Sequence, residues 1–249
     1  MKKTRRWLWL LLPAGLLVVL VIAAVLWATL VPSPMPEALA ALQPGPGIAV
    51  ETEPWIVFEP TDRVPKTGLI FYPGGRVDPR SYAPAARAIA EEGFLVVIPP
   101  MPLNLAVLDP DRAAEVQSAF SEIERWTIGG HSLGGAMAAQ FTADSPGQVD
   151  GLVLWAGYPP DSTDLSGTSL SVASIYGSLD GVAPPSQILE SRGRLPTTTA
   201  WIEITGGNHA QFGWYGPQSG DNPATITRED QQQQAIAATL RLLRFVEGE

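Results

Sequence analysis

One stretch of the chain carries residue types that can attack a carbonyl carbon. Residues 127–135 read as a strand that ends in Gly130-His131-Ser132-Leu133-Gly134 and passes directly into helix-favouring residues 136–141. This is the G-x-S-x-G nucleophile elbow, in which a serine sits on a sharp turn between strand and helix. The flanking glycines leave room for so tight a turn. The N–H groups at the start of the following helix face any oxyanion that forms at Ser132. We therefore predict that Ser132 is a nucleophile.

A serine nucleophile needs a base, and the chain has only two histidines. His131 adjoins Ser132 and is expected to point away from it, so a histidine base must be His209. Asp180 precedes His209 in the chain and comes just past the end of a predicted strand, which gives the order Ser…Asp…His. Asp161 and Asp164, which follow the preceding strand, are alternative candidates for the acidic residue that partners the histidine. The expected site is a serine, histidine and aspartate triad.

The segments between these residues must bring them together. Apolar runs predict strands that are buried on both faces, at residues 68–72, 94–98, 125–128, 151–157, 171–177 and 200–204. Helices are expected over residues 81–92, 109–124 and 227–247, the last capped by Thr227, with an apolar face of Ile236, Leu240 and Leu243. This alternation predicts an α/β fold with a mostly parallel sheet and helices on both faces. Residues 48–51 and 55–58 predict early antiparallel strands.

The chain resembles the α/β-hydrolase superfamily, and more narrowly its compact, lid-poor members related to dienelactone hydrolase. The resemblance covers roughly residues 48–247. It rests on four motifs: Tyr72-Pro73-Gly74-Gly75, Gly130-His131-Ser132-Leu133-Gly134, Gly177-Ser178-Leu179-Asp180 and Gly206-Gly207-Asn208-His209. It implies an α/β-hydrolase fold. Dienelactone hydrolases themselves use a cysteine nucleophile, and this chain has no cysteine, so their substrate does not carry over.

The resemblance also implies an oxyanion hole. In related hydrolases the strand at this place ends in His-Gly-x, and the backbone N–H of x is one donor. Counting back from Ser81-Tyr82, which resembles a Ser-Trp pair of the family, puts x at Gly75, with Arg76 as the second choice. Pro73 stands where the family has histidine. The other donor is expected to be the N–H of Leu133.

Composition limits the function classes. The 249 residues include 16 basic and 25 acidic ones, a net charge of −9. Four of the basic residues lie within the first six, so 12 basic residues face 25 acidic ones in the remainder. Such an acidic body argues against nucleic acid as a partner. The absence of cysteine excludes a disulfide and a thiolate metal site, and we expect neither metal nor cofactor.

The N-terminal residues 1–31 predict a membrane anchor. Residues 1–6 form a basic tip, and residues 7–31 carry no charge, which is long enough to span a bilayer. The positive-inside rule then places the catalytic domain outside the cytoplasm. Cleavage after Ala38-Leu39-Ala40 is the alternative and would give a secreted protein. Residues 32–47, rich in proline and glycine, predict a stalk with a helical turn over residues 37–43. Residues 48–249 form the hydrolase domain.

Several loops bear on access to the site. Residues 158–170 are too few to hold a helical lid, so we expect an open site. Residues 99–104 form either an apolar wall of the site or a plain connector. The aromatic segment 211–218 is expected to fold over His209, either lining a pocket or burying the base. Residues 231–234, all glutamine, read as the solvated start of the last helix.

These residues predict acyl transfer to water. His209 would take the proton of Ser132 as it attacks an ester, while Asp180 orients the imidazole. The expected partner is a small-molecule ester. Thioester or peptide hydrolysis by the same triad is one alternative, and a non-catalytic binding protein on a hydrolase scaffold is another. The oligomeric state is left open.

Overall fold

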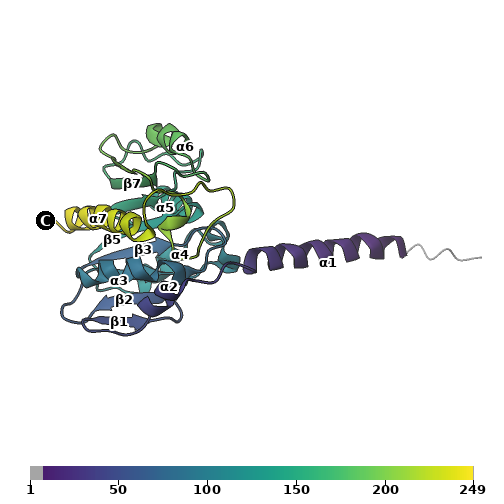
Figure 1. Cartoon of the computed structure of the whole chain (residues 1–249), viewed down its shortest axis with the longest axis horizontal. Helices are drawn as coiled ribbons and strands as arrows, with labels where there is room; N and C mark the ends of the chain where they lie inside the picture. The colour runs from purple at the N-terminus through teal and green to yellow at the C-terminus, as the bar shows by residue number, and fades with distance from the viewer. Residues whose placement is uncertain (1–7, 249) are drawn as a thin grey trace, which may run out of the picture.

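The computed structural model describes residues 8–248, and an eight-stranded sheet lies at its centre (Figure 1). The strand order is β1-β2-β4-β3-β5-β6-β7-β8. Among the described strands only β2 runs opposite to its neighbours, and the others are parallel to one another. This confirms both the mostly parallel sheet and the early antiparallel pair. The strands are β1 (Ile48–Glu51), β2 (Ile56–Pro60), β3 (Thr67–Tyr72), β4 (Leu95–Ile98), β5 (Arg125–His131), β6 (Gly151–Trp155), β7 (Ser171–Gly177) and β8 (Ala200–Ile204).

Helices cover both faces of the sheet, and each face has its own apolar core. In β4, Val96 and Ile98 belong to one cluster and Leu95 and Val97 to the other, because successive side chains of a strand point to opposite faces. The first cluster includes α3 (Ala83–Glu91) and α7 (Arg228–Glu247). The second includes α4 (Arg112–Ala119) and α5 (Leu133–Asp144). Burial on both faces explains the uninterrupted apolar runs of the central strands.

Shorter helical segments complete the described fold. They are α2 (Pro36–Ala41), α6 (Pro185–Glu190) and the 3-10 helices η1 (Pro79–Tyr82), η2 (Pro102–Asn104), η3 (Ala106–Leu108), η4 (Ser191–Arg194) and η5 (Ala210–Phe212). Among the described residues, none of these lies between β6 and β7, where the chain was expected to be too short for a lid.

The helix α4 is shorter than the sequence predicts. It begins at Arg112 because the Tyr72 hydroxyl caps it, accepting from the N–H of Ala113 at 2.7 Å and donating to the carbonyl of Pro110 at 2.8 Å. It ends by Phe120 because the chain must turn into β5, where the N–H of Glu124 already donates to the carbonyl of Lys66. The predicted cap, Asp109, instead pairs with the Arg112 side chain.

The closing helix α7 agrees better with its pattern. The Thr227 hydroxyl accepts from the N–H of Asp230 at 3.1 Å, and Gly248 ends the helix with a φ of 99°. Leu240 and Leu243 are buried as expected, and Ile236 is partly buried against the same cluster. Its first turns differ from the prediction: Gln231 and Gln232 are buried and not solvated.

The first described helix, α1 (Leu8–Thr29), projects away from the sheet (Figure 1). Among residues 8–248, the structure has no helix whose length and apolar character suffice to cross a membrane, so the predicted transmembrane anchor is not supported. The predicted basic tip, residues 1–6, lies outside the described residues. The extracytoplasmic location and the alternative of cleavage stay predictions.

The segment between α1 and the sheet packs on the domain. The N–H of Met35 donates to the carbonyl of Trp214 at 2.8 Å, and the Arg87 side chain donates to the carbonyl of Ala41. The helix α2 overlaps the helical turn predicted over residues 37–43 but ends at Ala41, and Ala38 within it is fully buried. Residues 34–43 therefore lie against the domain instead of spacing it from α1.

Candidate active site

Ser132 occupies the sharp turn between β5 and α5. Its backbone has φ 53° and ψ −120°, a strained conformation for a residue with a side chain. A Cβ at Gly130 would lie 2.5 Å from the backbone of Gly134, and one at Gly134 would lie 2.2 Å from the carbonyl oxygen of Tyr72. Only glycine fits at either position, so this turn requires the motif's spacing. The Ser132 side chain is left partly exposed at the carboxyl edge of the sheet.

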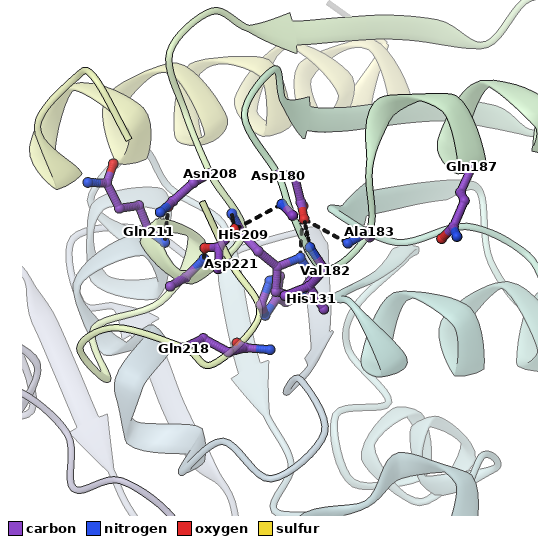
Figure 2. Close-up of polar contacts among 12 residues, drawn as sticks. His131, Asp180, Val182, Ala183, Gln187, Asn208, His209, Gln211, Gln218 and Asp221 are labelled. Carbon is purple, nitrogen blue, oxygen red and sulfur yellow. Dashed lines mark hydrogen bonds and ion pairs between the residues drawn. The ribbon is translucent and has the colours of Figure 1, made fainter. Parts of the chain in front are cut away.

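Asp180 and His209 meet at the same edge. Asp180 follows β7 and His209 follows β8, and His209 Nδ1 lies 2.8 Å from Asp180 Oδ2, with both side chains fully buried (Figure 2). Asp180 Oδ1 also accepts from the N–H groups of Val182 at 2.8 Å and Ala183 at 2.7 Å. Asp180 is thus no solvated turn residue, because its carboxylate is held by three hydrogen bonds.

The hydrogen bond to Asp180 also decides which nitrogen of His209 can act. A carboxylate only accepts, so the shared proton belongs to Nδ1 and leaves Nε2 as the basic nitrogen. Nε2 is buried and has no hydrogen-bond partner in the described part of the chain. The ring centroid of His209 is 4.5 Å from that of His131, the residue directly before Ser132. The elbow and the histidine loop are therefore in contact.

The rival acids do not reach either histidine. Asp161 has a side chain that is 97% exposed, and it pairs with Arg194 at 3.1 Å. Asp164 accepts from the N–H of Ser166 at 2.9 Å within its own loop. Of the three candidate carboxylates, only Asp180 lies beside His209.

The loop after β3 runs alongside the elbow. The N–H of Gly74 donates to the Tyr82 hydroxyl at 2.9 Å, and the N–H of Arg76 donates to the carbonyl of Asn104 at 2.8 Å. A Cβ at Gly75 would lie 3.0 Å from the Leu133 side chain, so the backbone of Gly75 passes closely over the start of α5. The N–H of Arg76 is already engaged by Asn104, whereas Gly75 is the other candidate for the oxyanion donor.

The segment after β4 is more than a connector. Leu105 approaches the position that a Cβ of Gly75 would occupy, at 3.9 Å. Asn104 also donates its side-chain amide to the carbonyl of Ala28 at 3.3 Å. Arg76 donates to the carbonyls of Trp27 at 2.8 Å and Leu30 at 3.2 Å. The end of α1 is thus bound to the loops that flank Ser132.

The aromatic segment after His209 packs on His131, the residue before Ser132. The ring of Phe212 stacks on His131 with centroids 5.8 Å apart, and Tyr215 lies 6.3 Å from the same ring. Arg228 of α7 holds this segment in place through the carbonyls of Ala210 and Gly213.

Two residues that support His209 have no distinctive signal in the sequence. The Asp221 carboxylate accepts from the N–H groups of Gly181 at 3.0 Å, His209 at 3.3 Å and Ala210 at 2.8 Å, which joins the acid loop to the histidine loop (Figure 2). Gln231 accepts from the N–H of Asn208 at 2.9 Å and donates to its carbonyl at 2.7 Å. The prediction that residues 231–234 are solvated is wrong for Gln231, because these two hydrogen bonds satisfy its amide inside the protein.

Comparisons with known proteins give the family and the fold. A family model described as the alpha/beta hydrolase family matches residues 68–233. A predicted CIB-like hydrolase from Thermoplasma acidophilum has a similar structure, with a TM-score of 0.60 at 18% identity over 80% of this chain and 100% of that one. The esterase domain of a Rhodothermus marinus protein gives 0.58 at 11% identity, over 76% and 92% of the two chains. The Thermus thermophilus protein TT1662 has a TM-score of 0.58 at 15% identity, over 81% of this chain and 99% of that one. No curated protein sequence matches the chain.

Proposed function

The chain belongs to the alpha/beta hydrolase family, and from this we propose that it hydrolyses carboxylic esters with Ser132 as nucleophile, His209 as base and Asp180 as the acid that orients it. The observation that carries the proposal is the buried hydrogen bond of 2.8 Å between His209 Nδ1 and Asp180 Oδ2. It leaves Nε2 of His209 buried and unpartnered, beside the strained turn that presents Ser132. An esterase domain among similar structures supports ester chemistry.

The proposed reaction has two halves. Ser132 Oγ attacks the ester carbonyl while His209 Nε2 takes its proton, and His209 then protonates the departing alcohol. The acyl group remains on Ser132 until a water, deprotonated by the same nitrogen, attacks it and releases the acid. Asp180 accepts the hydrogen bond from Nδ1 throughout and so stabilises the imidazolium.

The tetrahedral oxyanion needs donors that are not otherwise engaged. We assign the N–H groups of Gly75 and Leu133 to this role. The N–H of Leu133 is at the first turn of α5, where no intrahelical acceptor exists. The alternative donor, Arg76, gives its N–H to Asn104 O, so it supports the proposal less well than Gly75. A single oxyanion donor is typically worth about 10²–10³-fold in turnover.

The surroundings of Ser132 favour a substrate with an apolar part. The side chains of Leu105 and Leu133 lie beside the backbone of Gly75. A Cβ built on Gly75 would be 3.9 Å from Leu105 and 3.0 Å from Leu133. The connection from β6 to β7 holds no helix that could cover them. We infer that apolar acyl groups can reach Ser132 directly from solvent.

The test is hydrolysis of p-nitrophenyl esters of graded acyl length by the full chain and by Ser132→Ala, with Ser166→Ala as the matched control. We expect turnover and fluorophosphonate labelling in the wild type and in Ser166→Ala, and neither in Ser132→Ala. A folded wild type without ester turnover or fluorophosphonate labelling would contradict the proposal and favour a binding protein. Turnover of thioesters or peptides in preference to esters would move the activity to that class.

A further inference from the structure

One tyrosine hydroxyl is shared between the two loops that frame Ser132. Tyr82, the last residue of η1, is buried to 1% exposure. Its oxygen lies 2.9 Å from the backbone nitrogen of Gly74 and 2.9 Å from Nδ1 of His131. Gly74 directly precedes Gly75, and His131 directly precedes Ser132. A single oxygen atom therefore touches the neighbours of both the nucleophile and the assigned oxyanion donor.

The three groups at this oxygen fix the direction of each hydrogen bond. The Gly74 N–H can only donate, so the tyrosine oxygen accepts from it. If His131 Nδ1 also donated, the tyrosine O–H would be left without a partner in a buried place, which is destabilising. The three groups at this oxygen are all satisfied only when Tyr82 donates to Nδ1. His131 then carries its proton on Nε2, which is buried and has no hydrogen-bond partner among the described residues. The other tautomer would leave two buried atoms unpaired, the tyrosine O–H and Nε2.

The space around the bridge is closed to larger groups. A Cβ added to Gly74 would lie 2.8 Å from His131 Nδ1 and 2.9 Å from the Tyr82 oxygen. The rings of Phe71 and His131 pack against the tyrosine ring, with centroids 5.2 Å and 5.9 Å away. Gly74 and His131 therefore cannot shift relative to each other without breaking one of the two hydrogen bonds.

We propose that Tyr82 is a positioning residue of the hydrolytic site: its hydroxyl sets the distance between the Gly75 N–H and Ser132, and it holds His131 in the Nε2–H tautomer beneath His209. This role rests on the ester hydrolysis proposed above. The hydroxyl touches no reacting atom. It acts through the backbone of the loop after β3 and through the elbow.

The neutral state of His131 fits the same role. Burial, and then the neighbouring His209, hold the pKa of His131 well below its ordinary value. Burial likewise raises the pKa of the Tyr82 hydroxyl well above the usual tyrosine value, so the donor keeps its proton. A neutral ring 4.5 Å from His209 does not oppose the positive charge that His209 gains during catalysis.

The chain offers a matched control for the kinetic test. Tyr72 is also fully buried, and its hydroxyl likewise accepts from one backbone N–H, of Ala113, and donates to one acceptor, the carbonyl of Pro110. It does so on the other face of the sheet, within the cluster that includes α4 and α5. Tyr82→Phe and Tyr72→Phe thus remove equivalent hydrogen bonds, and only the first removes the bridge.

We expect Tyr82→Phe to lower kcat by about 10–100-fold with KM changed less than about twofold, because a misplaced oxyanion donor weakens only the transition state. The affinity for an alkyl boronic acid, which mimics the tetrahedral intermediate, should fall by the same factor as kcat/KM. Tyr72→Phe should unfold at a similarly reduced urea concentration and keep kcat within about twofold of wild type.

A second measurement needs no variant. Because the chain has two histidines, a long-range ¹H–¹⁵N spectrum of protein without added histidines shows two imidazoles. At pH 7 and above the ring of His131 should show the Nε2–H tautomer. Observation of its Nδ1–H tautomer would overturn the inference even if Tyr82→Phe failed to fold.

The outcomes distinguish a failure of the positioning role of Tyr82 from a failure of the proposed ester hydrolysis. An active wild type in which Tyr82→Phe and Tyr72→Phe lose kcat equally would overturn the positioning role and leave ester hydrolysis standing. A wild type without turnover or fluorophosphonate labelling would overturn both.

Discussion

Asp180 makes three hydrogen bonds, and only one of them bears on chemistry. The two from Val182 and Ala183 hold the carboxylate in place, so a substitution that keeps an acceptor there should keep the loop folded. Asp180→Asn does so, but its amide donates to His209 Nδ1 and moves the ring proton to Nε2. We expect kcat for ester hydrolysis to fall by about 10³–10⁴-fold without loss of fold.

Steady-state kinetics and urea unfolding on the same preparation check the expectation for Asp180→Asn. Asp164→Asn is the control, because Asp164 makes a comparable turn hydrogen bond, to Ser166, away from the site. Residual activity within tenfold of wild type would mean that Asp180 is not the orienting acid.

His131 predicts a pH dependence of stability whose sign follows from its burial. Burial, and then His209, lower its pKa well below the ordinary value of 6.5. As the pH falls below 6.5, the unfolded chain binds a proton at this ring and the folded protein does not, so protonation favours unfolding. Above pH 6.5 the group has no effect. Below it, the free energy of unfolding should fall by up to about 1.4 kcal/mol per pH unit until the folded pKa is reached.

Urea unfolding of wild type and His131→Phe between pH 5 and 8 isolates this effect. Phenylalanine keeps an aromatic ring in the pocket and removes the titration, so groups common to both proteins cancel. The stability difference between the two proteins should change below pH 6.5 in favour of the variant. A difference that stays constant with pH would show that His131 takes up a proton in the folded state.

At the scale of elements, the histidine loop is held from outside by α7. The fully buried side chain of Gln231 accepts a hydrogen bond from the N–H of Asn208 and donates one to the carbonyl of Asn208. Asn208 directly precedes His209. Gln231→Ala would leave both backbone groups unsatisfied. We expect a loss of about 2–4 kcal/mol in the free energy of unfolding, together with a lower kcat. Gln233→Ala, on the exposed face of the same helix, should cost less than about 0.5 kcal/mol. Equal unfolding midpoints in urea for the two variants would contradict this.

The end of α1 is another element tied to the site. The last carbonyls of a helix lack partners within it, and Arg76 donates to one of them, that of Trp27, and to the carbonyl of Leu30 directly after the helix. The Arg76 guanidinium also lies 4.3 Å from the centre of the Trp27 ring. In Arg76→Ala, amide hydrogen exchange over residues 27–31 should therefore speed up by about tenfold, which corresponds to about 1.4 kcal/mol. Arg80→Ala is the control, since Arg80 pairs with Asp78 in the same loop. Unchanged exchange in Arg76→Ala would show that Arg76 does not fasten α1.

At the scale of the whole molecule, the sheet was predictable and the supports of the site were not. The order of strands and helices follows from apolar runs because burial on both faces leaves a local pattern. Tyr82 meets His131 across 49 residues, and nothing local to either residue indicates that contact. Gln231 was misjudged for a related reason: a polar side chain reads as exposed unless its distant partner, here Asn208, is known. The sharp turn at Ser132 was predictable because it demands glycines at fixed positions.

Net charge acts on the molecule as a whole and gives a prediction for substrate choice. With 25 acidic and 16 basic residues, the protein repels anions at long range. The Debye length shrinks from about 30 Å at 0.01 M salt to less than 10 Å at 0.3 M, so salt removes most of this repulsion. The kcat/KM for an ester with a carboxylate on its acyl chain should therefore rise several-fold over this range.

A neutral ester of the same length is the control for this salt effect, and its kcat/KM should stay nearly constant. A fall in kcat/KM for the anionic ester would show that a local cation outweighs the overall charge. Arg76, whose guanidinium is bound to uncharged carbonyls beside the loop of Gly75, is the first candidate for that cation. The measurement of kcat/KM against salt concentration should then be repeated with Arg76→Ala. The fall should disappear if Arg76 causes it and persist if it does not.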